Sequence, residues 1–123
     1  MQLITTIPEL KFSGYDFTSL LLYASLYAYP PKPEQTSLTL YKRARAWDGY
    51  DYPVILITTN LAGYGHVAPP DTFYVKNYSE NEGLQEALID LGIIEIVEGS
   101  EPAYFGYSNS VRADLCQLTE QYR

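Results

Sequence analysis

The segment SENEGLQEALIDLG, residues 79–92, predicts a helix with a defined beginning and end. Ser79 and Glu82 have the S-x-x-E spacing of a capping box, which places the start of the helix at Ser79. Gly92 stands where a left-handed residue commonly ends a helix. Apolar side chains recur at the i, i+3, i+4 and i+7 spacing of one helical face. These side chains are Leu84, Ala87, Leu88 and Leu91.

Most of the chain outside this segment is predicted to form β-strands. Residues 37–47 and 52–60 are two β-compatible runs, and the Asp48-Gly49 pair between them favours a hairpin. The second run contains four consecutive apolar residues, a pattern typical of a strand covered on both faces, so we expect it at the centre of a sheet. These residues are Val54, Ile55, Leu56 and Ile57. Further strands are expected at residues 72–76, 93–97, 104–107 and 111–118.

Residues 19–29, SLLLYASLYAY, are compatible with either a strand or a helix. Leu20, Leu22 and Ala24 alternate as on a strand, whereas Leu20, Ala24 and Tyr27 share a helical face. The tyrosines favour a strand, and a proline-rich stretch ends the element in either case.

Together these patterns predict an α+β fold, mainly antiparallel β-sheet, with one amphipathic acidic helix packed on a face. The 123 residues, 46% of them hydrophobic and 19% charged, suffice for a single domain, residues 1–123, with one core. Cys116 is the only cysteine, which excludes an intrachain disulfide and a thiolate metal site, and we expect it to be buried. No secretory signal or membrane-spanning stretch is evident, so we expect the cytoplasm of a host cell.

The negative charge of the chain is concentrated in and after the predicted helix. The formal net charge is −7, and residues 80–101 hold seven carboxylates and no Lys or Arg. These carboxylates are Glu80, Glu82, Glu86, Asp90, Glu95, Glu98 and Glu101. A surface of this kind attracts cationic proteins and disfavours binding to nucleic acid and anionic lipid. We therefore expect a basic protein surface as the partner, with no direct nucleic-acid or membrane binding.

Three of these carboxylates, Glu82, Glu86 and Asp90, are spaced i, i+4 and i+8 and should form one row on the helix. The simpler interpretation is the solvated side of an amphipathic helix. Two costs favour a binding role instead: like charges at this spacing repel, and the helix dipole disfavours an anion near the C-terminus. If Glu95, Glu98 and Glu101 fold back beside the helix, the seven carboxylates would be spaced at one charge per ~2.6 Å along it. This spacing approaches the ~3.4 Å between the charges of a single DNA strand.

The chain contains 13 tyrosines, and those in or near predicted loops are the better candidates for partner contact. Others are expected to fill strand positions, for which Tyr has a good propensity. We expect Tyr104 and Tyr107 to add apolar contact beside the acidic residues. The full loop set is Tyr50, Tyr52, Tyr64, Tyr104 and Tyr107.

No catalytic, cofactor-binding or metal-binding pattern accompanies these features. His66, the only histidine, lies in a glycine-containing loop and has the chemistry of a general base, but a loop histidine without a catalytic task is the simpler interpretation. No recognisable nucleophile motif or further metal ligand supports it. We expect a protein that is not an enzyme and that needs no cofactor or metal.

Residues 73–94, FYVKNYSENEGLQEALIDLGII, resemble the most characteristic segment of a family of small uncharacterised proteins carried by phages, plasmids and integrated elements. The strand at residues 54–61 resembles the one before that segment, and the match is specific in its YSENEG core. The chain departs from the family at residues 99–102, where relatives more often carry a Gly-Arg pair. The resemblance implies carriage on a mobile element. By analogy with other small acidic proteins of such elements, including anti-CRISPR proteins and DNA mimics, it implies an inhibitor of host defence.

Three functions are compatible with the sequence. The first is a non-enzymatic inhibitor that docks its acidic residues, Tyr104 and Tyr107 onto a nucleic-acid-binding surface of a host defence complex, with a CRISPR-Cas effector as the leading target. The second is a structural or accessory protein of a phage or plasmid, homodimeric through an exposed sheet edge and without a defence target. The third is an enzyme that uses His66 with nearby carboxylates.

Overall fold

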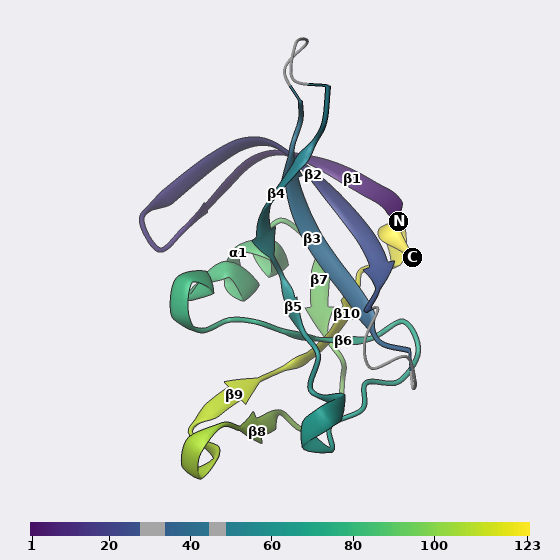
Figure 1. Cartoon of the computed structure of the whole chain (residues 1–123), viewed down its shortest axis with the longest axis vertical. Helices are drawn as coiled ribbons and strands as arrows, with labels where there is room; N and C mark the ends of the chain where they lie inside the picture. The colour runs from purple at the N-terminus through teal and green to yellow at the C-terminus, as the bar shows by residue number, and fades with distance from the viewer. Residues whose placement is uncertain (28–33, 45–48) are drawn as a thin grey trace.

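The computed structural model describes residues 1–27, 34–44 and 49–123, which form two antiparallel sheets, a separate strand pair and one short α-helix (Figure 1). The first sheet has the order β1-β2-β3-β4, the second has the order β5-β6-β10-β7, and β8 pairs with β9. This mainly antiparallel, α+β-like arrangement agrees with the expected class. No helix in these three ranges is long and apolar enough to span a membrane.

The strands and helices have the following bounds. The first sheet contains β1 (Gln2–Phe12), β2 (Tyr15–Leu26), β3 (Thr36–Lys42) and β4 (Tyr52–Leu56). The second contains β5 (Thr58–Thr59), β6 (Phe73–Val75), β7 (Ile94–Ile96) and β10 (Leu115–Leu118), and the separate pair is β8 (Ala103–Phe105) with β9 (Val111–Ala113). The helices are η1 (Ala62–Tyr64), η2 (Ser79–Asn81), α1 (Leu84–Asp90), η3 (Tyr107–Asn109) and η4 (Glu120–Tyr122).

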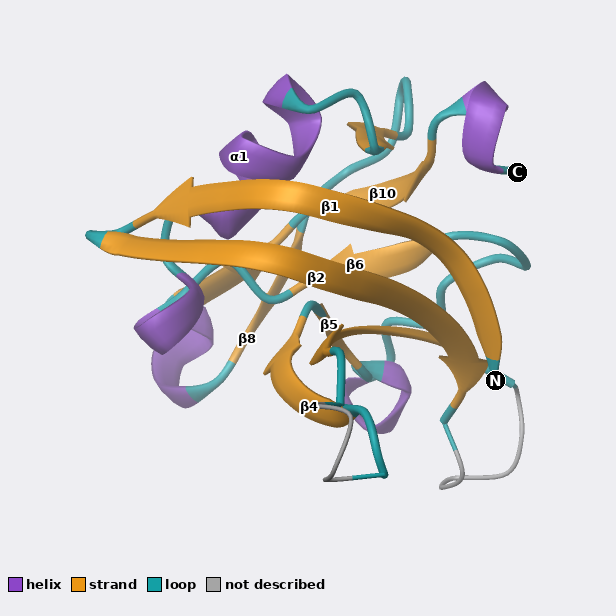
Figure 2. Ribbon diagram, turned by 90° about the horizontal axis from the view of Figure 1, so that it is seen from above, coloured by secondary structure: helices purple, strands orange, loops and turns teal. Residues whose placement is uncertain are grey.

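The longest element is the β1–β2 hairpin, which Figure 2 shows as two curved strands side by side. Its turn is Ser13-Gly14, both with positive φ, which suits the right-handed twist of a hairpin. The sequence predicted no strand before residue 19, whereas β1 and the first residues of β2 lie there, with a bulge between Leu3 and Thr5. The strand interpretation of residues 19–29 is confirmed as far as Leu26. Residues 28–33 and 45–48, which include Asp48 of the expected turn, lie outside the described residues.

The second sheet is buried on both faces. Successive side chains of β6 and β10 point in opposite directions, so each strand contributes to two hydrophobic clusters. Phe73, Val75 and Cys116 enter the main core, which also takes residues from the first sheet together with Leu84 and Leu88 of α1. Tyr74 and Leu115 enter a second cluster on the other face. The β8–β9 hairpin covers that face with Ala103, Phe105 and Ala113.

The expected central strand at Val54 to Ile57 is wrong. β4 lies at the edge of the first sheet and β5 at the edge of the second. The four apolar residues span the transition between them: Ile55 and Ile57 are buried, whereas Val54 and Leu56 are 36% and 43% exposed. The four consecutive apolar residues therefore do not mark a central strand. They mark the place where the chain passes from the edge of the first sheet to the edge of the second. The strand covered on both faces is instead the Phe73-Tyr74-Val75 run of β6.

Two further strand predictions need correction. Residues 104–107 do not form one strand, because β8 ends at Phe105 and Tyr107 begins η3. Residues 111–118 are divided between β9 and β10, with Asp114 between them.

The capping box predicted at Ser79 and Glu82 is also wrong. Ser79 begins the short η2 helix, and α1 begins after Gly83, whose φ of 89° marks a left-handed turn between the two. The N-terminus of α1 is satisfied from outside: Asn77 Oδ1 accepts the Gln85 backbone N–H at 2.9 Å. Asn77 Nδ2 also donates to the Glu86 carboxylate at 3.1 Å, so one side chain holds the first turn of the helix.

The predicted C-terminus of the helix is confirmed at Gly92, whose φ is 73°. Gly92 N–H donates to Ile89 O at 2.9 Å and Ile93 N–H donates to Leu88 O at 3.1 Å, the two bonds of a Schellman motif. Ile93 and Leu88 are both buried in the main core, which adds the apolar contact common to this motif. Leu91, expected on the buried face, is instead exposed.

We predict that Asn77→Ala destabilises the protein by about 1–2 kcal/mol, because it leaves the Gln85 N–H without its side-chain acceptor. Urea unfolding followed by circular dichroism measures the effect. The matched control is Ser79→Ala, at the position that the sequence favoured for the cap, which should change stability by less than about 0.5 kcal/mol. The reverse order of the two variants would show that Ser79 caps the helix after all.

Candidate partner-binding surface

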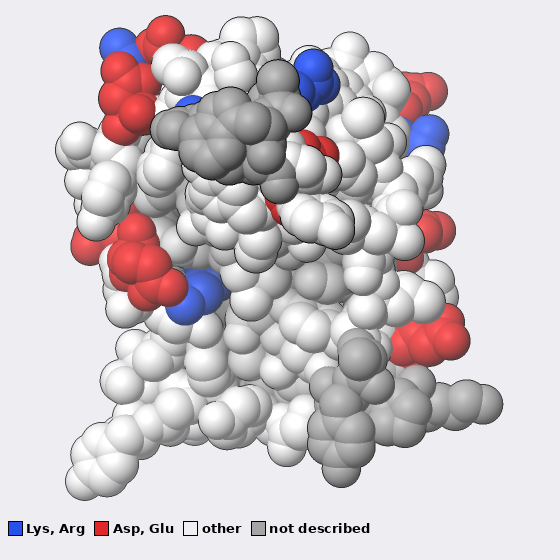
Figure 3. Space-filling model, turned by 45° about the horizontal axis from the view of Figure 1, so that its top comes forward, with Lys and Arg blue, Asp and Glu red and all other residues white. Residues whose placement is uncertain are grey.

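The row of Glu82, Glu86 and Asp90 that the sequence predicted on one helix is not formed. Glu82 precedes α1, and this helix has only seven residues, so Glu86 and Asp90 alone remain on it. A helix this short spans ~10 Å, so it does not present seven charges at the spacing of a DNA strand. In the face shown in Figure 3, acidic side chains lie in several separate groups, most of them toward the margins.

Three of the seven carboxylates are held by side chains of the same protein. Glu80 pairs with Lys76 at 2.5 Å and Glu95 pairs with Arg123 at 2.5 Å. Glu86 accepts two hydrogen bonds from Asn77. The other four are exposed and make no side-chain hydrogen bond or ion pair within the described part of the chain. They are Glu82, Asp90, Glu98 and Glu101.

The Lys76–Glu80 pair belongs to a chain of contacts that leads to the β8–β9 hairpin. The hydrogen bond from Lys76 is the main cause that lowers the pKa of Glu80 from 4.5 to about 2. Lys76 Nζ also lies 5.8 Å from the centre of the Tyr78 ring. Tyr78 in turn packs edge-on against Phe105 of β8, with 5.7 Å between ring centres. Glu80 is therefore paired within the protein and is a poorer candidate for direct partner contact.

The tyrosines predicted to contact a partner are separated into two places. Tyr50 and Tyr52 lie at the β3–β4 end of the molecule, whereas Tyr104 and Tyr107 belong to β8 and η3 at the opposite end (Figure 1). Tyr64 of η1 joins the second group, although 40 residues separate it from Tyr104. The three rings line an open hollow of about 690 Å³, which we call the tyrosine hollow. Its other lining residues are His66, Pro102, Phe105, Gly106 and Asn109.

The loop that presents Tyr107 has an unusual backbone. Gly106 has a φ of 79°, and a Cβ added there would lie 3.2 Å from Val111 Cγ2. Ser108 and Asn109 follow with φ of 54° and 51°, a region that side-chain-bearing residues rarely adopt. Tyr107, which lies between Gly106 and Ser108, is 92% exposed. Backbone in this region persists only where the surrounding structure enforces it, and such residues are often found at functional loops.

Beneath this loop a set of aromatic contacts fixes the hollow in place. Phe105 is buried in the second cluster and packs against Tyr64, with 5.6 Å between ring centres. His66 Nε2 lies 3.1 Å from Tyr104 O, so the imidazole N–H donates to this backbone carbonyl and ties the η1 loop to β8. The hollow is thus assembled from two segments that are far apart in the sequence.

His66 is held by a backbone contact, and Cys116 is buried. His66 makes no hydrogen bond to a carboxylate among the described residues, and its Nε2 is used to bind Tyr104 O. Cys116 is confirmed as a fully buried residue of the main core. Burial raises the pKa of its thiol to about 12, which keeps it protonated and unreactive. Within the described ranges, no three or more His, Cys, Asp or Glu side chains are grouped to hold a metal ion.

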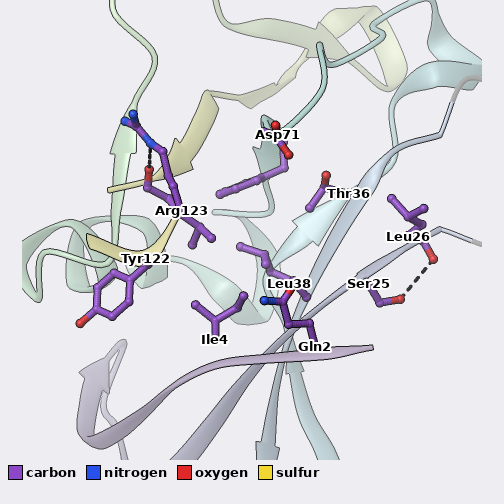
Figure 4. Close-up of a pocket in the computed structure, with 12 residues that line it drawn as sticks. Gln2, Ile4, Ser25, Leu26, Thr36, Leu38, Asp71, Tyr122 and Arg123 are labelled. Atoms are coloured by element: carbon purple, nitrogen blue, oxygen red, sulfur yellow. Dashed lines mark hydrogen bonds between the residues drawn. The ribbon is translucent and has the colours of Figure 1, made fainter. Parts of the chain in front are cut away.

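A second hollow, of about 400 Å³, lies between the two sheets near both ends of the chain (Figure 4). Ile4, Leu38 and Phe73 supply much of its apolar lining, and Asp71 and Arg123 lie at its rim. Arg123 is already engaged there, because its Nε donates to Leu118 O at 2.9 Å and its other end pairs with Glu95. The lining comes from both sheets and both termini, so no local sequence pattern signals this hollow.

Comparisons of the chain with protein-family models, with curated proteins and with solved structures gave no match.

We predict that the Glu80 carboxylate titrates near pH 2 in the folded protein, and that Lys76→Met raises its pKa toward the ordinary 4.5. Because the folded pKa is the lower one, the contact stabilises the fold above pH 4.5 and this contribution is lost as the pH falls toward 2. Carboxyl-detected NMR titration measures both values. Lys11→Met, which removes a cation paired with Glu9, should leave Glu80 unchanged. A wild-type midpoint near 4.5 would contradict the assignment.

Proposed function

We propose that the protein is a non-enzymatic inhibitor, encoded by a mobile genetic element, that binds a basic nucleic-acid-binding surface of a host defence complex. The observation that carries the binding role is the tyrosine hollow, where Tyr64, Tyr104 and the strained Tyr107 loop gather three exposed rings. Carriage on a mobile element and a defence target, with a CRISPR-Cas effector first, rest on the resemblance of residues 73–94 to phage- and plasmid-borne proteins.

Exposed tyrosines suit protein contact because each ring offers a large amphipathic surface at a small cost in side-chain entropy. Tyr is also among the residue types that most often dominate binding energy at an interface. Glu98 and Glu101 lie in the segment that joins β7 to β8 and make no ion pair with any residue that the structure describes, so they provide negative charge leading into the hairpin. Charges at the rim of an interface mainly raise the association rate and the salt dependence of binding.

The amphipathic acidic helix has a smaller part in this proposal than the sequence suggested. Leu84 and Leu88 face the main core, and Glu86 and Asp90 are exposed. Glu86 is held by Asn77, so Asp90 alone is left without a partner on α1 within the described residues. We therefore assign the helix a long-range contribution to electrostatic steering rather than imitation of a nucleic-acid strand.

One observation favours the alternative, a homodimeric accessory protein. Edge strand β4 exposes Tyr52, Val54 and Leu56, and an uncovered apolar edge is suited to pairing with another copy. Part of this edge is already used, because Asn81 Nδ2 donates to Leu56 O at 2.7 Å. Pro53 further reduces the number of N–H donors in the strand.

We predict that expression of the protein raises the plating efficiency of phage on a strain whose CRISPR-Cas system targets that phage. Tyr107→Ala should reduce this inhibition by about tenfold or more, as expected for an interface tyrosine. Tyr50→Ala is the matched control, since Tyr50 is also 82% exposed but lies at the other end of the molecule. Failure of the wild type across strains with different effector types would contradict the defence target.

Light scattering separates the alternative from this proposal. The inhibitor is expected to be monomeric at micromolar concentration, whereas the accessory protein should be a dimer that Val54→Lys dissociates. A dimer whose dissociation leaves phage plating unchanged would favour the accessory role.

A further inference from the structure

The tyrosine hollow is lined by aromatic rings, and acidic residues precede it in the chain. None of the residues that line it is Lys or Arg. Arg112, which is paired across the hairpin with Tyr104, is bound by Asp114: both Nε and a terminal nitrogen lie 3.0 Å from Asp114 Oδ1. Arg112 also interacts with Tyr104, but its guanidinium group is held by Asp114, which leaves the other two tyrosine rings of the hollow to a positive group from outside.

A cation is the ligand that this combination favours. The faces of Tyr and Phe rings carry negative electrostatic potential, so a cation placed over them is attracted, and more strongly where water is partly excluded. Glu101 directly precedes Pro102, which lines the hollow, and neither Glu101 nor Glu98 makes an ion pair within the described part of the chain. The net charge of −7 adds a long-range attraction for the same ligand.

Between the two cationic side chains, the hollow is better suited to arginine. The guanidinium group is planar and weakly hydrated, and it stacks on aromatic rings, whereas the lysine ammonium group is a compact and strongly hydrated charge. Three rings contributed by η1, β8 and η3 offer such stacking surfaces. The hollow is open, with Tyr107 92% exposed, which suits a side chain on an accessible segment of a protein.

We propose that the tyrosine hollow binds an arginine side chain of the partner, with the guanidinium group stacked on the tyrosine rings and its charge met by Glu98 and Glu101. This inference rests on the proposed function in that it names the chemistry of the partner at the same surface. It does not depend on the partner being a defence complex.

The test is an NMR titration of the isotope-labelled full chain with three short peptides of identical sequence that carry arginine, lysine or neutral citrulline at one position. The arginine peptide should shift amide signals of residues 62–66 and 101–109 and bind several-fold more tightly than the lysine peptide. Citrulline, which has nearly the same shape as arginine but no charge, should show no saturable shifts. Equal binding of arginine and citrulline, or of arginine and lysine, would overturn the inference.

Matched variants locate the site. Tyr107→Ala should weaken arginine binding by about tenfold, and Tyr50→Ala should leave it unchanged. The double variant Glu98→Gln with Glu101→Gln should weaken binding and reduce its salt dependence, whereas Glu120→Gln, which removes an exposed carboxylate in η4, should not. Thermal unfolding of each variant checks that the fold is retained. Unchanged binding by Tyr107→Ala would contradict the site. Weakened binding by Tyr50→Ala or Glu120→Gln would contradict it as well.

The two proposals fail in different ways. If the arginine peptide does not bind but phage inhibition still requires Tyr107, the arginine assignment is wrong and the proposed function stands. If the peptide binds at the hollow but no strain shows inhibition, the defence role is wrong and arginine recognition stands.

Discussion

Burial of the second sheet on both faces is the constraint on which the rest of the structure depends. β6 and β10 are short, yet alternate side chains along them serve two hydrophobic clusters at once: Phe73 and Cys116 pack in one cluster, Tyr74 and Leu115 in the other. Their pairing places Leu115 opposite Tyr74 and Cys116 opposite Phe73, so both clusters share one hydrogen-bonded register. A shift by one residue would exchange the two faces and disrupt both clusters.

This constraint also positions the candidate site. The β8–β9 hairpin has only three residues in each strand, and so small a hairpin is not stable alone in water. It is held because Ala103, Phe105 and Ala113 cover the outer face of the second sheet. Phe105 then supports Tyr64 above it, and Gly106 turns the chain so that Tyr107 extends into solvent. The protein thus combines a rigid base with a strained, exposed loop, an arrangement suited to contact with another molecule.

The sequence predicted those parts of the fold that local chemistry determines. The end of α1 at Gly92 followed from a glycine that adopts positive φ, and the burial of Cys116 followed from its neighbours. The start of α1 was not predictable from the capping box, because Asn77 caps the helix from beyond the intervening η2 and Gly83. For the site, Tyr104 and Tyr107 were identified as loop residues, but their proximity to Tyr64 depends on long-range packing through Phe105. The expected row of Glu82, Glu86 and Asp90 failed because α1 begins only at Leu84, which leaves Glu82 outside the helix. Lys76 and Arg123, outside the acidic segment, also pair with Glu80 and Glu95.

Native-state hydrogen exchange tests the central role of the second sheet most directly. Val75 N–H donates to Asp114 O and Val97 N–H donates to Leu115 O, and these bonds connect β6 and β7 to the β10 region. If this doubly buried sheet holds the molecule together, both amides should belong to the slowest class and exchange only through global unfolding. Exchange of these amides as fast as those of the Gly106–Ser110 loop would contradict the account, because the tyrosine hollow would then rest on a sheet that opens independently of the core.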